Sequence, residues 1–161
     1  MKKLVVYYSY PGQTKVIVDK ISSLIDCDVV ELKPLVPFGE YDQVVEEYQS
    51  NESDQKTVEI EDVPIDFDLY EKVIILTPVW WYTITPVMRE FLTKYDLTGK
   101  EVYPIATNAG WLGRTFKEIN SICRGNIHEG LSIKFSEDYH EKKILTSLDE
   151  IDNYIKKVEE D

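Results

Sequence analysis

Short apolar runs alternate along the chain with segments whose apolar residues recur at helical spacing. Continuous apolar runs such as residues 4–8 and 73–77 are typical of strands that are covered on both faces of a parallel sheet. The same pattern predicts strands over residues 29–32, 102–107 and 131–135. Strands that alternate with helices in this way indicate βαβ units and a parallel sheet.

Helix starts are marked by their capping residues. An amphipathic pattern over residues 17–25 predicts the first helix. Thr85 followed by Pro86 is the pattern of an N-cap with proline at the first helical position. Two more starts carry the capping-box spacing, Thr115 with Glu118 and Ser147 with Glu150.

These elements predict one domain over residues 1–161 with an α/β fold. The expected architecture is a three-layer sandwich whose doubly wound, five-stranded parallel sheet has the order 2-1-3-4-5. In such a sheet the ligand lies outside the carboxyl ends of strands one and three, where the strand order reverses. Pro104 is unusual inside the fourth strand, because proline cannot donate to a ladder.

The turn after the first strand has the chemistry of a phosphate site. Backbone N–H groups at a helix N-terminus favour an anion, and a glycine lets the backbone approach the phosphate oxygens. An ordinary turn that caps the helix would use the same residue types. The residues concerned are Ser9, Tyr10, Pro11, Gly12, Gln13 and Thr14.

Two more turns at the same edge of the expected sheet carry aromatic and small residues. A flat ring system would stack on aromatic side chains exposed there, and packing of a tryptophan into the core is the alternative. Small residues in the third turn leave backbone N–H groups for ring carbonyls. The second turn contains Pro78, Val79, Trp80, Trp81 and Tyr82, and the third contains Thr107, Asn108, Ala109, Gly110, Trp111 and Gly113.

With these motifs the chain resembles the flavodoxin-like FMN-binding family, in the branch whose third strand ends in a Pro-aliphatic-Trp-Trp motif. The resemblance covers nearly the whole chain, through Tyr8–Thr14, Thr77–Trp81, Asp96–Lys100, Thr107–Gly113 and Gly130-Leu131. It implies a flavodoxin-like fold with FMN as cofactor. The first turn would hold the phosphate, and the second and third turns would line the isoalloxazine on its two sides.

The chain departs from the family pattern at a few positions. The family usually has Thr before Gly-Asn-Thr in the phosphate turn, where this chain has Pro11 and Gln13. Tyr82 stands where glycine is common. Side chains of Tyr10 and Gln13 offer compensating contacts to the phosphate.

Charge narrows the range of partners. The chain has 30 acidic and 18 basic residues, for a net charge of -12, which argues against nucleic acid and anionic membranes as partners. The segment from Glu40 to Glu71 holds twelve of the acids and one base. Within it we expect a helix near residues 41–49, acids up to Glu47 beside the crevice, and acids from Glu59 onward at the opposite end of the sheet.

The two cysteines and two histidines of the chain show no pattern of a catalytic or metal site. Cys27 and Cys123 lack metal or disulfide spacing and are expected to be small buried residues, and His128 and His140 to be solvated. No metal site is expected. The apolar run near the start is too short for a signal peptide, and no stretch reaches the ~20 apolar residues of a membrane span. A soluble cytoplasmic protein is expected, with its oligomeric state open.

Three functions fit these residues. The protein is an electron carrier that exchanges electrons with a redox partner protein, an oxidoreductase that passes hydride from NAD(P)H to a small quinone-type acceptor, or a binding module that has lost its flavin. Pro11 favours the third and the Trp-Trp turn opposes it. The acidic surface favours the first, because it steers a basic partner and disfavours anionic NAD(P)H.

Overall fold

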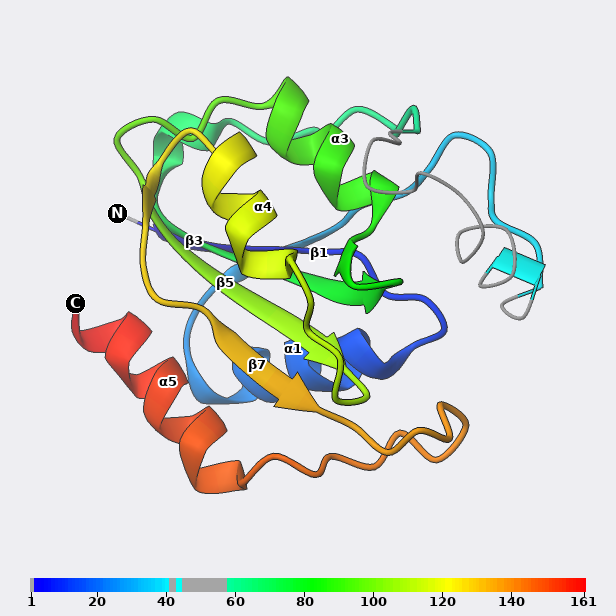
Figure 1. The fold of residues 1–161 in the computed structure, drawn as a ribbon. Coiled ribbons are helices and arrows are strands. Elements are labelled where there is room, and N and C mark those ends of the chain that lie inside the picture. Colours follow the sequence, from blue (N-terminus) through cyan, green and yellow to red (C-terminus); the bar gives the residue numbers. More distant parts are fainter. Residues whose placement is uncertain (1, 41–42, 45–57) are drawn as a thin grey trace.

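A seven-stranded sheet forms the centre of the computed structural model, which describes residues 2–40, 43–44 and 58–161 (Figure 1). Its main path has the order β2-β1-β3-β5-β6, while β4 pairs with β3 and β7 with β5. The strands are β1 (Lys2–Tyr7), β2 (Asp28–Glu31), β3 (Tyr70–Trp80), β4 (Thr83–Ile84), β5 (Glu101–Asn108), β6 (Asn126–Ile127) and β7 (Leu131–Lys134).

The predicted architecture is confirmed. The five expected strands correspond to β1, β2, β3, β5 and β7, all parallel and in the predicted order. The short strands β4 and β6 were not expected, and β3 extends beyond the predicted residues 73–77 at both ends. The extension of β3 at its carboxyl end shapes the crevice described below.

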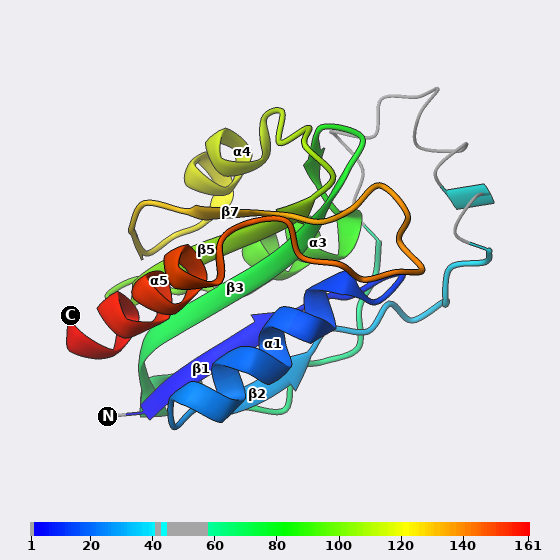
Figure 2. The same cartoon turned by 90° about the horizontal axis from the view of Figure 1, so that it is seen from below.

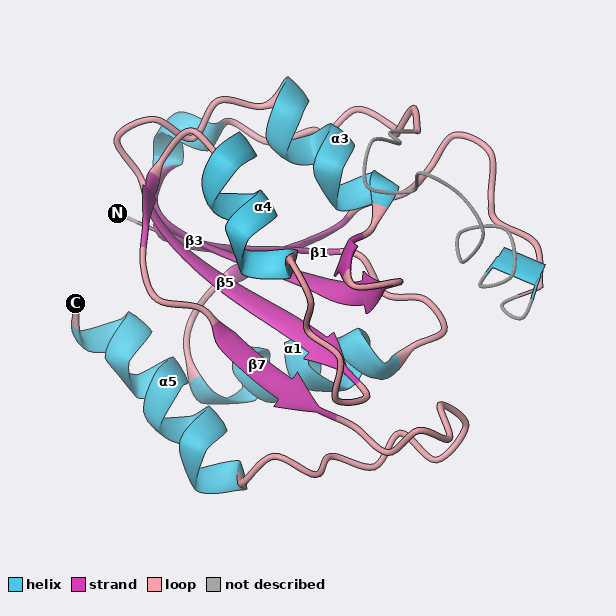
Figure 3. Cartoon of the chain, viewed as in Figure 1, coloured by secondary structure: helices cyan, strands magenta, loops and turns pink. Residues whose placement is uncertain are grey.

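Helices, cyan in Figure 3, cover both faces of the magenta sheet and complete the three layers. In Figure 2, α1 and α5 lie on one face and α3 and α4 on the other. The helices are α1 (Gln13–Leu24), α3 (Pro86–Lys94), α4 (Thr115–Ile122) and α5 (Leu148–Glu160), with a 3-10 turn η2 (Phe67–Leu69) before β3. The helix expected near residues 41–49 lies largely outside the described residues.

One of the three predicted helix caps is confirmed. The Thr85 hydroxyl accepts a hydrogen bond of 3.2 Å from the Met88 N–H, so Thr85 caps α3. The side-chain bonds of the two capping boxes do not form, although Ser147 is the N-cap residue of α5 as expected. Glu118 bonds the Arg89 guanidinium and the Thr83 hydroxyl instead of a backbone N–H, and the Ser147 side chain forms no capping bond. A tertiary ion pair has therefore replaced a local cap.

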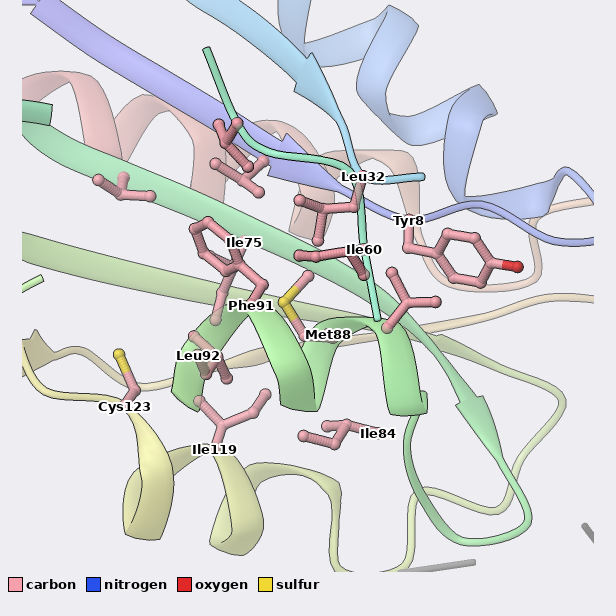
Figure 4. Close-up of a cluster of buried hydrophobic side chains, with 14 of the residues drawn as sticks. Tyr8, Leu32, Ile60, Ile75, Ile84, Met88, Phe91, Leu92, Ile119 and Cys123 are labelled. Atoms are coloured by element: carbon pink, nitrogen blue, oxygen red, sulfur yellow. The ribbon is translucent and has the colours of Figure 1, made fainter. Parts of the chain in front are cut away.

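The core consists of two apolar layers, one on each side of the sheet. Side chains alternate along β1, so that Leu4 and Val6 join the cluster under α3 and α4, while Val5 and Tyr7 join the cluster under α1 and α5. Figure 4 shows the first cluster, in which Phe91 of α3 points toward the sheet. Apolar burial of this kind is the main favourable term in folding.

Pro104 lies in a central strand at a point where the ladder to one neighbour is interrupted. The Val102 carbonyl of β5 accepts from the His128 N–H at the end of β6, so the same side of Pro104 faces that neighbour. There the pairing of β5 breaks off between β6 and β7, and the Tyr154 hydroxyl donates to the Pro104 carbonyl at 3.2 Å. The proline therefore falls in a gap of the ladder and not among its regular pairs.

The cysteines and histidines differ in part from expectation. Cys123 is buried, and burial raises the pKa of its thiol to about 11. Cys27 is only half-buried, although desolvation also raises the pKa of this thiol. His128 is not a solvated side chain, because its ring stacks on Tyr103 at 4.2 Å between centroids, whereas His140 is exposed as expected.

We expect Phe91→Ala to lower the free energy of unfolding by about 3–5 kcal/mol, because it leaves a cavity in a fully buried layer. Urea unfolding followed by circular dichroism measures the change. Leu148→Ala is the control, since Leu148 is 54% exposed and its truncation should cost less than about 1 kcal/mol. Equal losses would contradict the placement of α3 on the sheet.

Candidate functional site

Strand β3 runs past the end of β1 and forms the wall of a crevice. Tyr7, the last residue of β1, pairs with Leu76, and β3 continues to Trp80. On its other side β3 stays paired with β5 as far as Pro78. Beyond Leu76 the extension is no longer paired with β1, and its last two residues, Val79 and Trp80, pair with β4. It lies at the point where the strand order reverses and ligands bind in such sheets.

The extension ends in a tight hairpin whose two turn residues are aromatic. β3 and β4 pair antiparallel, Trp80 with Thr83, so Trp81 and Tyr82 alone form the turn. Their φ values are 51° and 68°, the left-handed region in which a two-residue hairpin of type I′ places both turn residues. Bulky side chains rarely adopt this conformation, because the Cβ crowds the following carbonyl.

The third turn holds the hairpin in this conformation. The Arg114 N–H donates to the Tyr82 carbonyl at 2.7 Å, and a methyl group placed on Gly113 would lie 2.2 Å from the same oxygen. On the other side, the Thr83 hydroxyl donates to Glu118, whose carboxylate accepts from Arg89 Nε at 2.8 Å. Arg89 and Glu118 are largely buried, so this ion pair fixes α3, α4 and β4 together.

The two tryptophans of the second turn have different surroundings. Trp80 is buried, and the rings of Tyr8, Tyr10 and Phe38 lie 5.1–6.1 Å from its ring centroid in edge-on geometry. The alternative of core packing therefore holds for Trp80. Trp81 is 40% exposed, and its ring centroid lies 5.0 Å from that of Tyr82, which is also exposed. These two rings are therefore accessible to a ligand.

The first turn has the unpaired donors that an anion needs. Gly12 is the N-cap of α1 with a φ of 140°, a conformation that favours glycine. The Ser9 hydroxyl accepts from the Lys15 N–H at 3.0 Å. The N–H groups of Gln13 and Thr14 find no acceptor among the described residues, as is usual in the first turn of a helix.

The third turn is organised by Asn108. Its side-chain oxygen accepts from the Gly110 N–H at 2.9 Å, and its amide nitrogen donates to the Ser132 hydroxyl at 2.9 Å. The Gly110 N–H is thus used within the turn, whereas those of Ala109 and Trp111 have no acceptor in the described part of the chain. Within the same turn the side chain of Trp111 is 54% exposed.

The structure brings the three turns into contact. The hydroxyls of Thr14 and Thr107 lie 2.8 Å apart and join the first turn to the third, while Tyr10 meets Trp80 of the second. The residues predicted for the site fall into three groups by exposure. Buried are Thr14, Pro78, Trp80, Thr107 and Asn108; half-buried are Ser9, Tyr10, Pro11, Gly12, Gln13, Val79 and Ala109; exposed are Trp81, Tyr82, Gly110, Trp111 and Gly113.

Two lysines that were not predicted as site residues lie against the glycines of the site. Methyl groups placed on Gly12 and Gly110 would lie 3.2 Å from Cε and Nζ of Lys142 and 3.3 Å from Cε of Lys134, respectively. Lys134 is the last residue of β7, and Lys142 belongs to the segment between β7 and α5. No local pattern marks them, because they come more than twenty residues after the third turn and reach the site only through the fold.

The later acids are placed only in part as expected. The Leu35 N–H donates to the Glu59 carbonyl, and the Glu61 N–H donates to the Lys33 carbonyl. Glu59 and Glu61 therefore lie beside the segment that follows β2, on the crevice side, and not at the far end of the sheet. We call the exposed acids at this edge, Glu31, Glu40, Glu59 and Glu61, the acidic rim. Asp66, Asp68 and Glu71 do lie at the far end, because they stand just before and at the start of β3, where Tyr70 pairs with Lys2.

This arrangement suits a flat ring that carries an anionic tail. Exposed Trp81, Tyr82 and Trp111 offer surfaces for ring stacking, and the unpaired N–H groups at the start of α1 offer an anion site. The predicted FMN has this shape and charge, so the residues present fit it. Among the described residues no cluster of His, Cys, Asp and Glu has the makings of a metal site.

Flavin- and nucleotide-binding proteins share a doubly wound α/β sheet with a site at the point where the strand order reverses. A family model described as "Flavodoxin" matches residues 2–149, which is most of the chain. The chain belongs to the flavodoxin family. Comparison with curated proteins gives no match.

Solved structures agree with this fold. A putative flavoprotein from Bacteroides eggerthii has a TM-score of 0.74 at 22% identity, covering 98% of this chain and 97% of its own. A putative flavoprotein from Bacteroides uniformis has a TM-score of 0.77 at 19% identity, covering 96% and 97%. A flavoprotein in complex with FMN from Lactobacillus acidophilus has a TM-score of 0.67 at 26% identity, covering 81% and 91%. None of the helices described here is both long and apolar enough for a membrane crossing.

We expect Gly113→Ala to lower the free energy of unfolding by more than about 3 kcal/mol, because the new methyl group clashes with the Tyr82 backbone. Gly99→Ala is a matched control. Gly99 also has a positive φ, 85°, but a methyl group there meets no atom within 4 Å. The control should lose only the backbone term of about 1–2 kcal/mol. Equal losses in chemical denaturation would contradict the support of the hairpin by the third turn.

Proposed function

We propose that the protein is an FMN-carrying electron carrier that docks a basic redox partner protein at the crevice. One observation carries this proposal: the exposed aromatic hairpin stands at the switch point of the sheet, in the same crevice edge as the acidic rim. Family membership and the FMN complex of the Lactobacillus acidophilus relative support the choice of cofactor.

The first turn would hold the FMN phosphate. The N–H groups of Gln13 and Thr14 point from the positive end of α1, and Gly12 has no side chain to block the approach. Ser9 already caps the helix and Thr14 already bonds Thr107, so both hydroxyls act in the first place as supports of the turn. Pro11 removes one donor, and the other N–H groups of the turn remain.

The second and third turns would hold the isoalloxazine. Trp81, Tyr82 and Trp111 are exposed and able to stack on it, while Trp80 supports the hairpin from the core. When bound, FMN supplies the redox chemistry, and the protein sets its orientation and access. A ring held by exposed side chains lies at the surface, within reach of a partner protein.

The acidic rim favours a protein partner over a nicotinamide substrate. Exposed carboxylates such as Glu31 and Glu59 create a negative field that speeds association with a basic surface and slows that with an anion. Glu31 also borders a hollow of about 180 Å³ together with Ser9 and Tyr10, so the rim reaches the first turn. An NAD(P)H-dependent oxidoreductase that reduces a quinone-type acceptor is the second candidate.

We expect the purified protein to bind FMN with a flavin absorption spectrum, and Trp81→Ala to raise the dissociation constant about tenfold. Loss of one stacked ring accounts for about 1–3 kcal/mol. Titration of the apoprotein with FMN, followed by quenching of flavin fluorescence, gives both constants. Leu24→Ala is the control, because Leu24 is 50% exposed but lies at the far end of α1. A wild-type protein that binds no FMN at saturation would instead be a module without flavin.

We expect NADPH alone to leave the flavin of the loaded protein oxidised, with or without a quinone, and a separate basic reductase to reduce it. Stopped-flow absorbance records the bleaching of the flavin. Because electrostatic steering is screened by salt, the rate with the reductase should fall as ionic strength rises. Direct bleaching by NADPH with multiple turnovers would favour the oxidoreductase.

A further inference from the structure

We infer that Lys142 is a phosphate ligand that makes the site selective for FMN over flavins without a phosphate. The inference rests on the proposed function, because it assigns a residue to the proposed FMN site. It starts from the position of the Lys142 ammonium, which lies against Gly12 at the start of α1.

The segment that carries Lys142 is closed into a loop by its own backbone and is joined to the first turn by one hydrogen bond. Phe135 and Ile144 form an antiparallel bridge, and the Ser136 N–H donates to the Lys143 carbonyl at 2.8 Å. Gln13 Nε2 of the first turn donates to the Ser136 carbonyl at 3.5 Å. In Figure 2 this orange segment runs beside the start of α1. The placement of Lys142 thus follows from a closed loop and not from a free side chain alone.

The surroundings of Lys142 are unfavourable for a cation unless an anion binds. The N-terminal end of a helix carries a partial positive charge, and a lysine there is repelled. Acidic side chains of the same loop are near in sequence, Glu137, Asp138 and Glu141, yet among the described residues none forms an ion pair with Lys142. Two sources of positive charge therefore converge on Gly12 without a compensating negative one.

A phosphate is the anion that this geometry suits. At neutral pH a phosphate monoester carries about -1.5 to -2 charges and three acceptor oxygens, which match an ammonium and several backbone N–H groups at once. The protein as a whole is strongly acidic, with a net charge of -12, so a local positive site is needed to overcome its repulsion of a dianion. Riboflavin has the same ring as FMN and lacks only the phosphate, so comparing the two isolates this contact.

We expect Lys142→Gln to raise the dissociation constant of FMN about tenfold and to change that of riboflavin less than about twofold. Lys143→Gln is the matched control, since Lys143 is the adjacent exposed lysine and should leave both constants unchanged. Lys142→Arg keeps the charge and should recover most of the FMN affinity. The dependence of FMN affinity on salt should also be weaker in Lys142→Gln than in the wild type.

A structural role for Lys142 is tested by the stability of the apoprotein. Removing a cation from the start of α1 relieves repulsion, so the melting temperature of apo Lys142→Gln should equal or exceed that of the wild type. A lower melting temperature, or an equal loss of FMN and riboflavin affinity, would overturn the inference. If the wild type binds FMN and Lys142→Gln binds it with the same affinity, the inference about Lys142 is wrong and the proposed function stands. Absence of FMN binding by the wild type would overturn the proposed function as well.

Discussion

The length of β3 is the constraint on which the site depends. β3 extends beyond its pairing with β1 from Thr77 to Trp80. On its other edge β5 pairs with this extension as far as Pro78. The chain must then return to begin α3 at Pro86, and a two-residue hairpin is the connection that the short antiparallel pair allows. This connection forces Trp81 and Tyr82 into left-handed conformations and presents both rings at the crevice. The third turn and the Arg89–Glu118 pair then serve to hold the hairpin.

Sequence patterns predicted the fold well because both faces of the sheet are covered. Continuous apolar strands, the helical spacing between them and the Thr85-Pro86 start are local signals, and the parallel order follows from their alternation. The hairpin was not predictable from the same signals, because its turn lacks the glycine or asparagine that marks type I′. The capping box predicted at Thr115 and Glu118 does not form for a similar reason. Arg89, a partner distant in sequence, binds the Glu118 carboxylate in place of a local N–H.

The placement of the site turns was predictable, and the roles of their side chains were not. Rules for doubly wound sheets bring the three turns to one edge, but they do not say which side chains turn inward. Trp80, Thr14 and Asn108 are used to build the turns, whereas Trp81 and Trp111 remain exposed. The crevice has an acidic rim beside β2 and two lysines beside the first and third turns. In the proposed function, such a division lets one edge of the sheet hold the phosphate of FMN and still attract the proposed basic partner.

Whether the three turns form one binding site is tested by the amide chemical shifts of the ¹⁵N-labelled protein during titration with FMN. We expect the largest shifts at Gln13–Thr14, Trp81–Tyr82 and Ala109–Trp111, together and with one affinity. Amides beside the groove between α1 and α5, such as those of Leu24 and Lys156, should stay unchanged. Shifts centred on that groove, or shifts in only one of the three turns, would contradict the account.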